Sequence, residues 1–125
     1  MGNPGRVFLE GSPQIAVTAP AQTSVGTGAM VLLIENAKRK GLIVVNTGTT
    51  TIKLTLGDTA PTQMAYHVPL KACSVADDGS GSAYFDASWV GVVRAISDGA
   101  GGTCVVTEIL TGSPDWNRAG AWGVE

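Results

Sequence analysis

Residues 40–56 read KGLIVVNTGTTTIKLTL, and this stretch decides the fold class. Leu42 to Val45 form an unbroken apolar run rich in β-branched residues, which predicts a strand buried on both sides. Residues 52–56 alternate apolar and polar, which predicts a strand with one apolar and one wet face. Asn-Thr-Gly-Thr at 46–49 suits a turn. The stretch therefore predicts a β-hairpin, and it contains no catalytic group.

The rest of the chain repeats this pattern of short strands and turns. Further strands are expected at 30–35, 65–72, 83–86, 89–96 and 103–110, with Pro69 confining the second of these to a sheet edge. Turn residues separate these strands, and a helical period is almost absent. We therefore expect an all-β protein, an antiparallel β-sandwich or jelly-roll-like barrel. Its core is predicted at 29–110, between extended N-terminal (1–28) and C-terminal (111–125) arms.

The two ends are predicted to bind partners. Prolines in residues 1–28 prevent a continuous helix, so this segment is either an extended arm or an irregular first strand. Phe8 and Leu9 are apolar and would stay wet in a free tail. Trp116 and Trp122 bear large apolar area on stiff side chains, as interface anchors do. We expect these four residues to dock on another chain; the alternative is a tail that folds back onto its own domain.

The composition excludes several classes of function. Charged residues make up 14% of the chain, the net charge is -2, and Lys38-Arg39-Lys40 is the only basic cluster. We expect that cluster to be a solvated turn, because nucleic-acid binding needs a wider basic stripe. No run approaches the length of a membrane span, and we expect no secretory signal. A weakly charged surface favours close contact with other chains.

No pattern of residues indicates an enzyme, a cofactor or a metal. His67 stands alone, and Asp77-Asp78 lies in a Gly/Ser turn where aspartate is common. With Asp58, Asp86 or Asp98 this pair would offer oxygen ligands for calcium, but the spacing does not match an EF-hand loop. Glu108 is expected on the wet face of its strand. Cys73 and Cys104 are expected to be reduced, although a bridge stays open if their strands are adjacent.

Several segments together resemble a family of small structural proteins of tailed bacteriophages, the head decoration (cement) proteins. The resemblance rests on residues 36–48 (NAKRKGLIVVNTG), on 52–57, on 92–102 (VVRAISDGAGG) and on 105–108. It spans roughly residues 36–110. Ala37-Lys38 stands where Pro-Asn is usual in that family, so the turn before the first apolar strand differs.

The resemblance implies a β-sandwich virion protein without enzymatic activity. It would be assembled in the host cytoplasm, would form a homotrimer, and would bind the major capsid protein at local threefold positions of the outer capsid surface. Three copies with arms that reach separate subunits would turn weak contacts into avid binding. Two alternatives stay open: a glycan-binding or fibre-base module that uses Trp89 or Trp116, and a head-completion or tail-associated phage protein.

Overall fold

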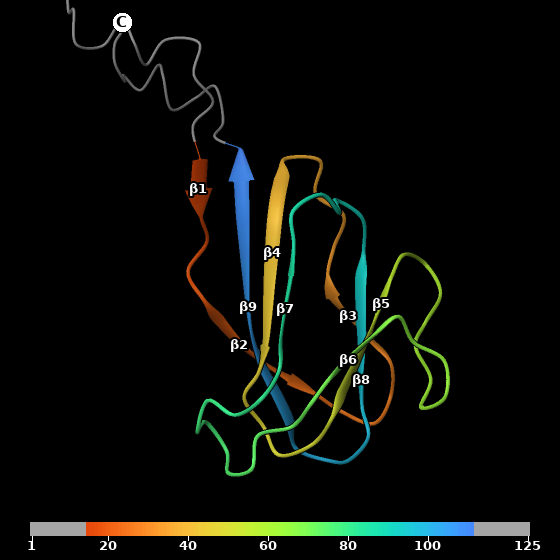
Figure 1. Cartoon of the computed structure of the whole chain (residues 1–125). Coiled ribbons are helices and arrows are strands. Elements are labelled where there is room, and N and C mark those ends of the chain that lie inside the picture. Colours follow the sequence, from red (N-terminus) through yellow and green to blue (C-terminus); the bar gives the residue numbers. More distant parts are fainter. Residues whose placement is uncertain (1–14, 112–125) are drawn as a thin grey trace, which may run out of the picture.

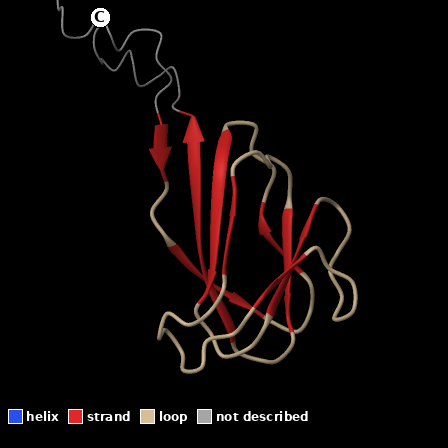
Figure 2. Ribbon diagram, in the orientation of Figure 1, coloured by secondary structure: helices blue, strands red, loops and turns tan. Residues whose placement is uncertain are grey.

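The computed structural model describes residues 15–111, which form nine β-strands and no helix (Figures 1 and 2). The strands are β1 (Ile15–Val17), β2 (Ala21–Val25), β3 (Met30–Leu33), β4 (Arg39–Asn46), β5 (Ile52–Leu56), β6 (Val68–Leu70), β7 (Ala83–Asp86), β8 (Val93–Ser97) and β9 (Gly102–Thr111). β5 and β7 match the predicted bounds, and β9 extends the predicted strand by one residue at each end.

The strands form two antiparallel sheets that pack face to face (Figure 1). Sheet A has the order β1-β9-β4-β7, with β2 also paired to β9, and sheet B has the order β3-β8-β5-β6. If β1 and β2 are counted as one interrupted strand, this order is that of a jelly roll. The prediction of an all-β antiparallel sandwich is confirmed.

The described part of the N-terminal segment belongs to sheet A. β1 pairs with Ile109–Thr111 and β2 pairs with Gly102–Val106, so both lie along the same edge of β9. Pro20 falls between them, and a proline lacks the N–H that a continuous ladder requires. Thr18 holds the interruption in place, since its N–H donates to the Glu108 carbonyl and its hydroxyl accepts the Glu108 N–H, both at 2.9 Å. Residues 1–14 and 112–125, with the predicted anchors Phe8, Leu9, Trp116 and Trp122, lie outside the described residues.

The predicted hairpin at residues 40–56 is wrong. β4 lies in sheet A and β5 in sheet B, so the connection between them crosses from one sheet to the other. The buried Asn46 side chain builds this crossing: its amide donates to the carbonyls of Thr50 and Leu70, both at 2.9 Å, and its oxygen accepts the Gly48 N–H. Gly48 is needed because a Cβ there would lie 2.9 Å from the Thr103 hydroxyl. The polar turn thus links two layers instead of two paired strands.

The core lies between the sheets and consists of the inward residues of both. Its fully buried apolar side chains include Leu42, Val44, Ile52, Leu54 and Val93. Leu42 and Val44 are buried, but their neighbours Ile43 and Val45 are only half-buried. The prediction that this strand is buried on both sides is therefore wrong. Residues 89–92 are not strand, since β8 begins at Val93. β6, with Pro69, is at the edge of sheet B as predicted.

Candidate interaction surface

The outward face of sheet A is apolar across four adjacent strands. The registers place Val17 opposite Ile109, Ile43 opposite both Thr107 and Phe85, and Val45 opposite Val105. Directly opposed residues of antiparallel strands project from the same side of a sheet. We call this surface the outer face of sheet A and define it by Ile15, Val17, Ile43, Val45, Phe85, Val105 and Ile109.

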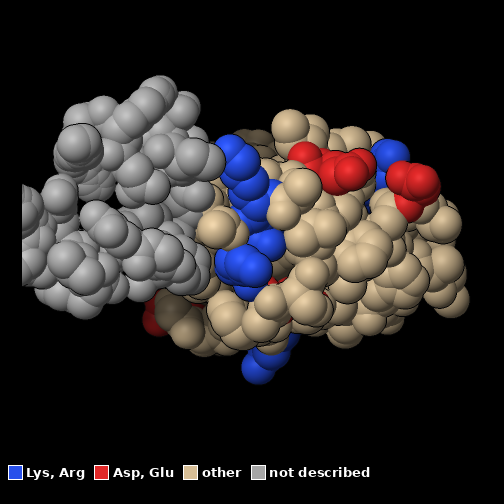
Figure 3. Space-filling model, turned by 90° about the horizontal axis from the view of Figure 1, so that it is seen from above, with Lys and Arg blue, Asp and Glu red and all other residues tan. Residues whose placement is uncertain are grey.

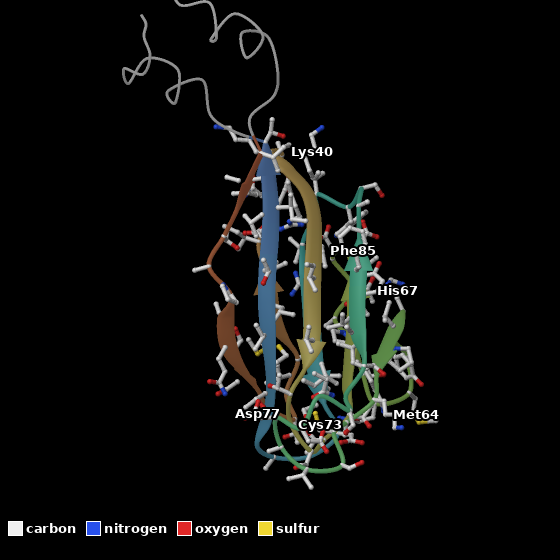
Figure 4. All side chains as sticks on the ribbon, turned by 60° about the vertical axis from the view of Figure 1, so that its left-hand side comes forward. Lys40, Met64, His67, Cys73, Asp77 and Phe85 are labelled. Carbon is white, nitrogen blue, oxygen red and sulfur yellow. The ribbon has the colours of Figure 1, made fainter. Side chains whose placement is uncertain are left out.

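This face exposes large side chains and carries no charge. Ile15 is 56% exposed, Val17 63% and Phe85 59%. The other outward residues of sheet A in the described chain are small or polar but uncharged, namely Gln22, Ser24, Gly41, Ala83, Thr103, Thr107 and Thr111. Lys40 lies at the end of the sheet, beyond Phe85 (Figure 4). Extended apolar patches of this kind on a protein surface mark interaction sites.

Gly41 brings two of these side chains together. A Cβ at Gly41 would lie 3.3 Å from Ile109 Cδ1 and 3.6 Å from Phe85 Cε1, so both side chains lean over the glycine from the neighbouring strands. An aromatic ring that covers a strand glycine in this way also pins the register of the sheet. Because Gly41 has no side chain, Ile109 and Phe85 form one apolar surface over it, near the end of β9.

Sheet B differs because its own chain covers its outer face. Residues 57–67 fold over it: the Thr55 hydroxyl donates to the Thr59 carbonyl at 2.6 Å, and the Gln63 amide donates to the Ser97 carbonyl at 2.8 Å. Lys53 donates to the Gln63 carbonyl and lies 5.2 Å from the centre of the Tyr66 ring. Thr55 and Ile96 therefore point outward yet are only 3% and 6% exposed. No described segment covers sheet A in the same way.

Arg39 and Glu108 were both placed wrongly by the sequence patterns. Arg39, expected in a solvated basic turn, is 2% exposed, and its guanidinium donates to Glu108, to the carbonyls of Ile34 and Gly91, and more weakly to that of Trp89. Glu108, expected on the wet face, points inward to meet it. The register shift of β4 between Arg39 and Gly41 is a bulge that turns Arg39 inward. This pair joins two loops to the end of β9.

The carboxylates of residues 74–89 build turns. The Asp86 side chain accepts the N–H groups of Ser88 and Trp89, and these bonds lower its pKa despite the opposing effect of burial. The Asp78 side chain accepts from Ser80 and from the Val75 N–H, which lowers its pKa. Within residues 15–111, no three His, Cys, Asp or Glu side chains gather as metal ligands would. Asp77 adopts a φ of 61° in the same turn.

The remaining reactive groups also have structural surroundings. His67 Nδ1 accepts the Leu56 N–H at 2.9 Å. Cys73 and Cys104 are buried free thiols, and Cys73 donates to the Asn46 carbonyl. Trp89, considered above for sugar stacking, packs partly buried against the core, and its ring N–H donates to the Val92 carbonyl. It is therefore poorly placed to stack on a sugar.

A cavity of about 250 Å³ opens between the edge of sheet A and β3. Its lining includes Thr18, Thr23, Leu32, Val106 and the Glu108 carboxylate that is bound to Arg39. Since that carboxylate is already paired, we assign no chemistry to the cavity. In the view of Figure 3 most of the described surface is neither acidic nor basic, and the described residues include no helix able to cross a membrane.

Sequence reasoning missed the outer face of sheet A as a site. The signal was present: Ile43, Val45, Val105 and Ile109 are apolar, and each has at least one apolar neighbour along its strand. The run at Leu42–Val45 predicts burial on both sides, whereas the structure covers only one side of β4 with another sheet.

Comparison with known proteins adds little to this geometry. No model of a protein family and no curated protein matches the chain. Among solved structures, it is similar to a protein of Bacillus endospore appendages, described as a novel family of disulfide-linked pili. The two chains are 16% identical, with a TM-score of 0.48, over 82% of this chain and 93% of the other. We draw no conclusion about function from a likeness at this level.

Proposed function

We propose that this protein is a structural, non-enzymatic subunit of a tailed-bacteriophage head. In this proposal it is a decoration protein that binds the major capsid protein at local threefold positions, as a homotrimer. The observation that carries the proposal is the uncharged, apolar outer face of sheet A, which the described part of the chain leaves uncovered. A sandwich with such a face, and with no cluster of three or more His, Cys, Asp or Glu side chains among residues 15–111, suits a protein that works by contact.

The sequence resemblance supports the choice of a phage head. Its segments correspond to β4, β5, β8 and β9, which are the central strands of the two sheets. The resemblance therefore concerns the body of the sandwich, and the outer face of sheet A is built on two of these strands. The terminal segments, which it does not cover, carry the predicted partner anchors Phe8, Leu9, Trp116 and Trp122.

Co-sedimentation with empty capsids tests the proposal. A trimer at every local threefold position contributes one chain per capsid subunit, so we expect binding to saturate near an equimolar ratio with the major capsid protein. Saturation at a few copies per particle would instead indicate a head-completion or tail role. No binding to capsids of the phage that encodes the protein would refute the proposal.

Paired variants test whether the outer face of sheet A makes the contact. Val17→Thr and Phe85→Thr place polar or smaller side chains on this face, and each is expected to weaken capsid binding about tenfold or more, the effect of losing about 1.5 kcal/mol of apolar contact. Val31→Thr is the matched control, because Val31 is 41% exposed and pairs with Arg94 on the outward side of sheet B. Equal binding by all three variants would exclude this face as the contact.

A further inference from the structure

The outer faces of the two sheets differ in whether the described chain covers them. Sheet B carries a cover made by residues 57–67, whose hydrogen bonds reach Thr55 and Ser97. Sheet A has no such cover within residues 15–111, although its outward side chains are more apolar than those of sheet B, which include Lys53 and Arg94. Because burying apolar surface from water is favourable, an apolar segment that can reach this face is expected to pack on it.

Both undescribed segments join the molecule at the rim of this face. Ile15 and Thr111 are directly paired across β1 and β9, so residues 1–14 and residues 112–125 attach side by side (Figure 1). Ile109 is two residues from this point along β9. Figure 4 places Phe85 and Lys40 toward this end of the molecule, whereas Asp77 and Cys73 lie at the opposite end.

The reach of the C-terminal segment matches the dimensions of the face. Trp116 is five residues beyond Thr111, and five extended residues span up to about 17 Å. Phe85 is two strands from β9 and opposite Ile43, which pairs with Thr107, four residues before Thr111. With strand spacing of about 4.8 Å and a rise of about 3.4 Å per residue, that separation is also about 17 Å. Ile109 and Val17 are closer, so all of these side chains are within reach of Trp116.

The size of the face argues for a segment and against a second flat copy of the sheet. From β1 to β7 it spans three strand spacings, about 14 Å, and from Ile109 to Val105 four residues, also about 14 Å, so its flat area is about 200 Å². A stable interface buries about 800 Å² per partner. One tryptophan side chain buries about 150–250 Å², which matches the face.

We propose that Trp116 packs in cis on the outer face of sheet A, over Val17, Ile109 and Phe85. The short tether raises the effective concentration of the tryptophan at its own face to the millimolar range, above that of any second copy in dilute solution. In this proposal the C-terminal segment covers the outer face of sheet A, as residues 57–67 cover that of sheet B. This inference concerns the free protein and does not depend on the partner proposed above, which must displace Trp116 to contact the same face.

Fluorine NMR of the full-length protein, labelled with 5-fluorotryptophan, tests this inference. The three tryptophans give three resonances, which are assigned by the single substitutions Trp89→Phe, Trp116→Phe and Trp122→Phe. We expect the Trp116 resonance to be displaced from the position of a solvated tryptophan. Val17→Thr and Phe85→Thr should return it toward that position, and Val31→Thr, on the other sheet, should leave it displaced. Trp89 packs against the core and reports in each variant whether the fold is intact.

Several results would overturn the inference. A Trp116 resonance at the solvated position in the unmodified protein would mean that the segment does not cover the face. A displacement that grows with protein concentration would assign the face to a second copy. A displacement that survives both Val17→Thr and Phe85→Thr would place Trp116 elsewhere. A response of the Trp122 resonance alone would mean that Trp122, and not Trp116, covers the face.

Discussion

Arg39 Nε donates to Glu108 Oε2 at 2.8 Å, and this pair joins the start of β4 to β9 inside the sandwich. The Arg39 side chain is fully buried, while that of Glu108 is 19% exposed. The other guanidinium nitrogens donate to carbonyls at Ile34 and Gly91, so one side chain connects the ends of β3 and β8 to the same point. An arginine suits this position because its planar fork donates in several fixed directions.

The first prediction concerns the stability that this pair contributes. Arg39→Met removes every donor at once and leaves the Glu108 carboxylate and two or more carbonyls without partners. We expect the free energy of unfolding to fall by about 3–5 kcal/mol, as when one partner of a buried ion pair is removed. Urea unfolding measures the change. Lys40→Met, at the exposed neighbouring position, should change it by less than about 0.5 kcal/mol; similar effects of both variants would contradict the assigned role of Arg39.

The second prediction concerns the connection between the sheets. Asn46→Ala removes both amide donors and the acceptor for the Gly48 N–H, at a residue that is 1% exposed. Since an unsatisfied buried group costs about 1–3 kcal/mol, we expect a loss of about 3 kcal/mol in thermal or urea unfolding. Asn36→Ala is the control, because its side chain makes one exposed bond, to the Lys38 N–H. A loss no larger than that of the control would show that the crossing does not depend on Asn46.

The third prediction separates two glycines that lie outside the strands, Gly81 and Gly26. A Cβ at Gly81 would overlap the Asn46 carbonyl oxygen and approach Cys73 Sγ to 2.9 Å, whereas nothing lies within 4 Å of a Cβ at Gly26. Gly81→Ala must therefore displace backbone, and we expect it to lower the free energy of unfolding by about 2 kcal/mol or more. Gly26→Ala should be neutral, or stabilising by about 0.4–1 kcal/mol through the unfolded chain. The reverse order of the two variants in urea unfolding would disprove the close approach at Gly81.

The fourth prediction concerns alkaline pH. Burial raises the pKa of Cys104 from 9.0 to about 11. Between these values the native chain holds a proton that the unfolded chain has lost, so the free energy of unfolding falls as the pH rises from about 9 to 11. Cys104→Ala should flatten this slope in urea unfolding at several pH values.

Tyr84 also contributes to the pH dependence of stability in this range, and its contribution has to be removed. Burial, and then its bond to Asp86, raises the pKa of Tyr84 from 10.0 to about 12, which also lowers stability as the pH rises through that range. The Cys104 comparison is therefore made in the Tyr84→Phe background. An unchanged slope there after Cys104→Ala would mean that Cys104 ionises alike in the native and unfolded chains.

Local patterns predicted most strands, but not how they pair. β5 and β7 appear with the expected bounds, because alternation and apolar runs report directly on a strand and its inner face. β4 and β5 were expected to pair because they are consecutive. In this jelly roll β5 and β6 are the consecutive described strands that pair within a sheet, whereas the chain after β4 changes layers. No pattern within residues 40–56 distinguishes these two outcomes.

Charge patterns failed where tertiary contacts decided burial. Lys38-Arg39-Lys40 looks like a solvated cluster, and only the bulge in β4 together with the carbonyls of distant loops makes a buried site for Arg39. The candidate contact residues divide similarly: Phe8, Leu9, Trp116 and Trp122 lie outside the described residues, while the outer face of sheet A emerged only from the registers of β1, β9, β4 and β7.

The amino-acid sequence by itself determined that this chain forms strands, where many of them run and which turns separate them, because those properties depend on neighbouring residues. The tertiary structure alone decided which strands share a sheet, that Arg39 and Glu108 meet in the interior, and that residues 57–67 cover the outer face of sheet B while no segment among residues 15–111 covers that of sheet A. The physical reason is that pairing and burial depend on residues far apart in the chain, whose proximity no local periodicity encodes.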